Sequence, residues 1–178
     1  MEELNLNCNL SPELYLELMM LFNINSALHN NFKMVLRENS NEGCFIYTLD
    51  KTDINSIKDI KIYGLFGSSI NNDSQFEDYL YMEVGVKLLS SGTPLEIKTI
   101  NAGKLKRCGR GSAAIRFLEE ILIPELNGIL LCFKYSEKIR YIYGISAELS
   151  PDTNALARAK FYNKNGFIIS HSHFYKYL

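Results

Sequence analysis

The fold is decided by residues 95–123, which have the sequence LEIKTINAGKLKRCGRGSAAIRFLEEILI. The first part, residues 95–100, follows the turn at residues 90–94 and is predicted to be a β-strand. From Ser112 onward the apolar residues recur at helical spacing, and we expect Pro124 to end this helix. A strand that leads through a loop into an amphipathic helix favours a mixed α/β protein.

The loop between these two elements favours the binding of an anion. From Lys98 to Arg116 the chain holds six Lys and Arg residues and no acidic residue. Gly109-Arg110-Gly111-Ser112 stands directly before the helix, where glycines let backbone N–H groups turn inward and the helix dipole adds positive potential. The pattern predicts a phosphate site, and a glycine turn with solvated charges remains the alternative.

Two common phosphate-binding motifs do not fit this loop. The P-loop pattern GxxxxGK[ST] does not occur in the chain. The dinucleotide pattern GxGxxA is matched from Gly109 to Ala114, but eight residues separate Gly109 from Ile100, whereas that fold places its first glycine beside the strand. Only 67 residues follow Gly111, too few for the rest of a doubly wound sheet. We therefore exclude a nicotinamide site.

Patterns elsewhere predict a mixed, mostly antiparallel sheet flanked by helices. A helix is expected to open at Ser11-Pro12, and another is expected over residues 155–164, stopping at Gly166. Residues 79–89 and 95–100, joined by a turn at 90–94, predict an antiparallel pair. Further strands are expected at residues 32–37, 44–49, 61–66, 129–133, 140–146, 167–169 and 174–178.

Length and composition indicate one soluble domain. The chain has 178 residues, of which 47% are hydrophobic and 22% charged, as in globular proteins rather than disordered or collagen-like chains. No apolar run reaches the ~20 residues of a membrane span. Met1-Glu2-Glu3 carries acids where a signal peptide is basic, and the four cysteines form no CxxC pair. We expect reduced thiols, a cytoplasmic location and no membrane partner.

Charge is divided unevenly along the chain. Residues 1–97 hold 6 basic and 14 acidic residues, whereas residues 98–178 hold 13 and 6. This split suggests an anionic partner for the second half and a cationic one for the first, although the halves can also attract each other within the fold. Nucleic-acid binding is disfavoured but stays open, because no aromatic residues are interleaved with the basic loop.

Two motifs resemble those of the GNAT superfamily of acyl-CoA-dependent N-acyltransferases. Lys106-Arg107-Cys108-Gly109-Arg110-Gly111 is similar to its Q/R-x-x-G-x-G/A pyrophosphate loop, with Lys in place of the usual Gln or Arg. Residues 161–167, FYNKNGF, are similar to the F-Y-x-x-x-G-F signature of its last helix. The resemblance covers about residues 94–170 of a single domain over residues 1–178 and leaves residues 1–90 as a variable acceptor-side half.

The resemblance implies an N-acetyltransferase that moves an acetyl group from acetyl-CoA directly to a primary amine of an unidentified acceptor, either a small molecule or a protein. The acidic composition of the first half suggests that this acceptor is cationic. Tyr162 would protonate the leaving thiolate and Glu96 would be the base, with Glu83 and Glu148 as rivals. Residues at the strand end and in the loop would bind the cofactor: Ile100, Asn101, Ala102, Lys106, Arg107, Cys108, Gly109, Arg110, Gly111 and Ser112.

Other interpretations are kept beside this one. The fold could serve a non-catalytic acyl-CoA-binding or interaction module, or a toxin-type acetyltransferase that acts on aminoacyl-tRNA, and a homodimer is compatible with either. Asp152 and Asn154 are better explained as helix caps than as cofactor ligands. His171 and His173 share one strand face, but without a third ligand nearby we expect no metal site.

Overall fold

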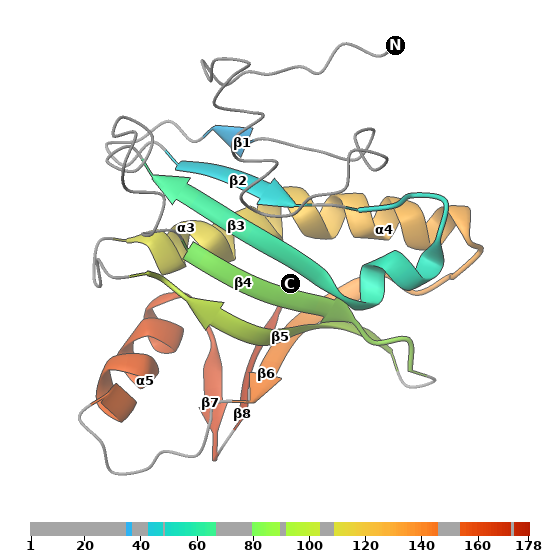
Figure 1. The fold of residues 1–178 in the computed structure, drawn as a ribbon. Helices are drawn as coiled ribbons and strands as arrows, with labels where there is room; N and C mark the ends of the chain where they lie inside the picture. Colours follow the sequence, from blue (N-terminus) through green and yellow to red (C-terminus); the bar gives the residue numbers. More distant parts are fainter. Residues whose placement is uncertain are drawn as a thin grey trace, which may run out of the picture.

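The computed structural model describes residues 35–36, 43–47, 49–66, 80–89, 92–103, 109–145, 154–171 and 173–178. Within these residues, eight strands form one sheet in the order β1-β2-β3-β4-β5-β6-β8-β7 (Figure 1). The strands are β1 (Val35–Leu36), β2 (Gly43–Tyr47), β3 (Ile60–Phe66), β4 (Leu80–Val86), β5 (Thr93–Asn101), β6 (Ile139–Ile145), β7 (Ile168–Ser170) and β8 (His173–Tyr177).

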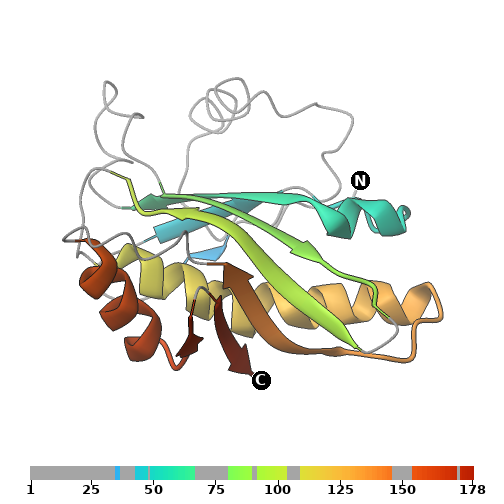
Figure 2. The ribbon, with the colours of Figure 1, turned by 90° about the horizontal axis from the view of Figure 1, so that it is seen from below.

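The helices of the described part are three α-helical segments and two short helices of other types. They are η2 (Ile54–Lys58), α3 (Arg110–Phe117), η3 (Leu118–Leu122), α4 (Ile123–Cys132) and α5 (Asn154–Lys164). The segments α3, η3 and α4 follow one another without a break and lie along one face of the sheet (Figure 2). The predicted class, a mixed sheet flanked by helices, is therefore confirmed at this coarse level.

Neighbouring strands are antiparallel everywhere except between β5 and β6, which run parallel. The predicted antiparallel pair of β4 and β5 is confirmed. The sequence patterns also located β2, β3, β6, β7, β8, α5 and the start of α3 to within a few residues. The helix expected at Ser11-Pro12 lies outside the described residues.

Two expectations around Pro124 are wrong. The helix does not end there, because η3 is a π-helical turn and α4 continues from it to Cys132. A proline inside a helix clashes with the carbonyl four residues earlier, and the wider turn makes room for the ring. The predicted strand at 129–133 is part of α4: Ile129 and Leu130 face the core, and a short apolar run cannot distinguish a buried strand from a buried helix.

The core lies between the sheet and the α3–α4 helix. Phe117 of α3 stacks on Phe45 of β2 at 4.7 Å between ring centroids and meets the edge of Tyr47 at 5.4 Å. Tyr47 is buried, and its hydroxyl donates a 2.5 Å hydrogen bond to Glu125 of α4. These contacts fix the long helix against the sheet and thereby position the N-terminal end of α3.

Strands β5 and β6 part before β5 ends. Their parallel pairing runs from Thr93 to Ile97, which is opposite Gly144, whereas β5 continues to Asn101 along β4. The register of β4 and β5 also shifts here: Val84 faces Ile97 and Glu83 faces Thr99, so Lys98 is an extra residue that forms a β-bulge. Figure 1 shows β5 and β6 diverging toward their ends.

Candidate functional site

The site expected from the sequence centres on the N-terminal end of α3. Gly109 precedes the helix with φ 80°, a left-handed conformation that glycine adopts without steric cost, and no side chain of the described residues caps the helix start. The first N–H groups of an α-helix have no acceptor within the helix. They carry the positive end of the helix dipole, so this turn can hold an anion such as a phosphate.

The two sequence motifs meet at this turn. A Cβ atom built on Gly111 would lie 2.7 Å from Cε2 of Phe161, so the aromatic ring occupies the space that the missing side chain leaves. Phe161 belongs to α5, which lies beside the start of α3 in Figure 2. The contact brings together residues 50 positions apart in the sequence and leaves no room for a larger residue at Gly111.

The Arg110 side chain is only 3% exposed, so a ligand outside the helix would meet this residue through its backbone rather than through its guanidinium. Gly111 is buried, Ser112 is half-buried and Gly109 is exposed. Lys106, Arg107 and Cys108, which were expected to complete the phosphate loop, lie outside the described residues. Ile100, Asn101 and Ala102 are described, on the part of β5 that has left β6 and just beyond it.

Tyr162 lies in an aromatic cluster between α5 and the last two strands. Its ring stacks on Phe174 at 3.8 Å between centroids and meets Phe161 and Phe167 edge-on at 5.1 and 5.6 Å. The residue is 7% exposed, and burial raises the pKa of its phenol to about 12, although the nearby charge of Arg158 acts in the opposite direction. The phenol is therefore protonated at neutral pH, which an acid catalyst requires.

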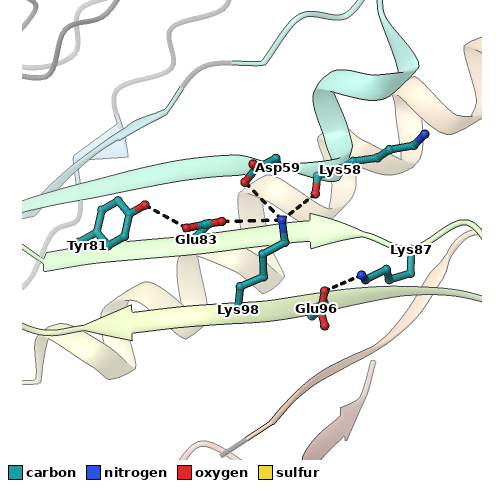
Figure 3. A network of polar contacts seen from close by, with 7 residues as sticks. All are labelled: Lys58, Asp59, Tyr81, Glu83, Lys87, Glu96 and Lys98. Carbon is teal, nitrogen blue, oxygen red and sulfur yellow. Dashed lines mark hydrogen bonds and ion pairs between the residues drawn. The ribbon is translucent and has the colours of Figure 1, made fainter. Parts of the chain in front are cut away.

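A network of charged side chains occupies the face of the sheet opposite α3 and α4. Its centre is the Lys98 ammonium at the bulge, which contacts the Lys58 carbonyl oxygen at 3.1 Å, Asp59 at 3.3 Å and Glu83 at 3.7 Å (Figure 3). Glu83 also accepts a 3.1 Å hydrogen bond from the Tyr81 hydroxyl. Burial, followed by this hydrogen bond, raises the pKa of Tyr81 to about 12. Lys98 thus joins the basic half of the chain to the acidic half.

Glu96, the expected base, lies on the same face, next to the last paired residues of β5. Its carboxylate is 3.1 Å from the Lys87 ammonium (Figure 3) and accepts a hydrogen bond from the Tyr143 hydroxyl on β6. Burial and the charge of Glu96 raise the pKa of Tyr143 to about 12. Of the three carboxylates considered from the sequence, Glu96 and Glu83 are therefore held on one face of the sheet. Glu148 lies outside the described residues.

Sequence reasoning missed a tyrosine-rich surface beside Glu96. Eight positions of β6, β7 and β8 alternate with core residues such as Ile142 and Phe174, and therefore face away from the helices. We call this surface the tyrosine face, and its residues are Tyr141, Tyr143, Ile145, Ile168, Ser170, His173, Tyr175 and Tyr177. The period-two spacing of the tyrosines in residues 141–143 and 175–177 was the signal that could have revealed it.

Within the described residues, no three His, Cys, Asp or Glu side chains gather in a way that could hold a metal ion. His171 and His173 are both exposed, and His171 adopts a left-handed turn conformation with φ 53°. None of the described helices is both long enough and apolar enough to span a lipid bilayer.

Comparison of the chain with protein-family models, with curated protein sequences and with solved structures finds no match.

Proposed function

We propose that the chain is an N-acetyltransferase of the GNAT type, which transfers an acetyl group from acetyl-CoA to a primary amine. The observation that carries the proposal is the contact of Phe161 with Gly111, because it joins the two motifs at the start of α3. Each motif alone is short and has a structural explanation. They meet at a helix start that no side chain of the described residues caps, and β5 and β6 diverge in the same part of the molecule. This arrangement favours a ligand that carries both phosphates and a long flexible arm.

The described residues fit such a ligand at two places. The first turn of α3 offers backbone N–H groups to a diphosphate. The end of β5, from Thr99 to Asn101, is paired with β4, and its pairing with β6 has already ended. An extended amide chain can add to such a strand edge through backbone hydrogen bonds. Acetyl-CoA would supply the acetyl group, which is activated as a thioester.

The proposed catalytic roles rest on the protonation state of Tyr162 and on the place of Glu96 on β5. Tyr162, with a pKa of about 12, would keep its proton at neutral pH and donate it to the sulfur as the thioester bond breaks. Glu96 would accept the proton of the attacking amine, directly or through water. Its contact with Lys87 orients the carboxylate beside the place where β5 leaves β6.

Calorimetric titration with coenzyme A tests the proposal. The wild-type protein is expected to bind it, and Gly111→Ala is expected to weaken binding about tenfold or more, because the new Cβ would lie 2.7 Å from the Phe161 ring and displace the turn. Gly128→Ala is the matched control, since nothing lies within 4 Å of a Cβ at that helical position. Absence of any binding to the wild-type protein would refute the acetyltransferase.

Turnover with a panel of amines separates an enzyme from a binding module. Acetyl-CoA consumption is expected to need the amine, and Tyr162→Phe is expected to lower kcat by about 100-fold while leaving coenzyme A affinity within a factor of two. Tight binding of coenzyme A without turnover on any amine would instead identify a non-catalytic acyl-CoA-binding module.

A further inference from the structure

We propose that the tyrosine face binds an organic ammonium group, and that this group belongs to the amine acceptor. The identification of the cation as the acceptor rests on the proposed acetyltransferase function. The cation site itself rests on the arrangement of side chains on β6, β7 and β8.

Four tyrosine rings form a two-by-two array on this surface. In the strand register, Tyr143 is opposite Tyr175 and Tyr141 is opposite Tyr177. Ring centroids are 6.2 Å apart for Tyr141 and Tyr143, 6.1 Å for Tyr141 and Tyr177, and 5.8 Å for Tyr175 and Tyr177. The faces of aromatic rings carry negative potential and attract cations, so a continuous array offers several contacts to one alkylammonium group.

The aromatic rings of this surface favour a cation rather than an anion. Its eight positions hold no Lys, Arg, Asp or Glu. The carboxylate at its border is Glu96, which contacts the Lys87 ammonium at 3.1 Å as well as the Tyr143 hydroxyl, so the two border charges are paired with each other. A phosphate-bearing partner would require basic residues among the aromatic ones, as single-stranded nucleic-acid sites have. The surface offers aromatic rings and a carboxylate instead.

The position of the array suits an amine that must reach a thioester. Glu96 and Tyr143 are paired in the register, and the next pair, Ile97 and Gly144, is the last one before β5 leaves β6. No residue pair of the described β5 and β6 follows this one, so we place the passage between the two faces of the sheet here. A ligand held at the start of α3 on one face and an amine held beside Glu96 on the other can therefore meet there. An aliphatic amine is mostly protonated at neutral pH, so the acceptor arrives as a cation.

Binding of choline, compared with 3,3-dimethylbutan-1-ol, tests the cation site. The two molecules have nearly the same shape, and only choline carries a charge. Choline has no primary amine to be acetylated, so binding is measured without turnover and without acetyl-CoA, by ligand-observed NMR titration of the full chain. Choline is expected to bind about fivefold or more tightly than the neutral alcohol.

Paired substitutions separate the aromatic face from a general loss of structure. Tyr175→Leu is expected to weaken choline binding about fivefold, whereas Tyr175→Phe is expected to keep it, because phenylalanine retains the π-face. Tyr135→Leu is the matched control, since Tyr135 is an exposed tyrosine on the loop after α4. Tyr177→Leu, at a residue 70% exposed, tests the array at a position where folding is insensitive.

Three outcomes would overturn the cation site. Equal binding of choline and the neutral alcohol would show that the surface binds these molecules by hydrophobic contact and does not recognise the positive charge. Self-association of the protein that disappears in Tyr177→Leu would assign the surface to a second copy of the chain, and oligonucleotide binding that disappears in Tyr175→Leu would assign it to nucleic acid. Failure of coenzyme A binding with choline binding intact would refute the acetyltransferase and leave the cation site standing.

Discussion

The part of the sheet formed by β6 and β8 has aromatic residues on both faces, and their roles differ between the two faces. On the inner face, Phe174 packs over Gly144 and stacks with Tyr162, and all three residues are buried. On the outer face, Tyr175 is half-buried and Tyr177 is 70% exposed. Residue type does not determine the role of an aromatic ring here. The face of the sheet on which a ring lies determines its role, and this face follows from the alternation of side chains along each strand.

The test with the largest expected effect on stability removes one aromatic ring from each face of the sheet. Phe174→Ala is expected to lower the free energy of unfolding by about 4 kcal/mol, because it leaves a cavity among Tyr162, Phe167 and Gly144. Tyr177→Ala is expected to lower it by less than about 1 kcal/mol. Urea denaturation followed by circular dichroism measures both values, and equal losses would contradict the assignment of the two faces.

A second, smaller effect tests how tightly the inner face is packed. In Gly144→Ala the new Cβ would lie 2.2 Å from Cζ of Phe174 and 2.8 Å from the Ile97 carbonyl oxygen, and we expect a loss of about 2 kcal/mol. Gly128→Ala, on the exposed side of α4, is expected to change the stability in the opposite direction by up to about 1 kcal/mol, since alanine favours helix. A neutral Gly144→Ala would show that the Phe174 ring is free to move.

The smallest expected effect concerns alkaline pH. The pKa of Tyr162 is raised from 10.0 to about 12 by burial, so between these values the unfolded chain loses a proton that the folded chain keeps. Stability therefore falls as pH rises from about 10 to about 12. Tyr162→Phe is expected to make this fall shallower, whereas Tyr177→Phe, at a largely solvated ring, is the control. Midpoints of urea denaturation, measured at intervals from pH 9 to 12, give the dependence of stability on pH for the wild-type protein and the two variants. The same dependence for all three proteins would contradict the burial of Tyr162.

Local patterns were enough to predict most of the described strands, because alternation and turn residues are local properties. The antiparallel partnership of β4 and β5 followed from their short connection. The parallel pairing of β5 with β6 did not, since the α3–α4 helix separates these strands in the chain. The helix boundary was wrong because the effect of Pro124 depends on the π-helical turn before it, which no periodicity indicates.

For the candidate site, the sequence suggested which segments carry chemistry but not what surrounds them. The glycines before α3 were found from their spacing, whereas the contact of Gly111 with Phe161 is tertiary. Glu96 was chosen for its place on β5, yet its partners Lys87 and Tyr143 come from two other segments. The tyrosine face joins residues from three strands, so its continuity depends on the register of β6, β7 and β8.

The π-helical turn at Leu118–Leu122 has a consequence for the history of the chain. Such a turn is equivalent to an α-helix that has gained one residue, and it keeps the apolar side chains before and after it on a single stripe. Here that stripe holds Ala114 and Ile115 on one side of the turn and Leu126 and Ile129 on the other. Consider a version of this protein that has one residue fewer in the turn and another residue in place of Pro124. It would present the same apolar stripe along a straight helix. Length variation at this point is therefore expected to leave the core unchanged.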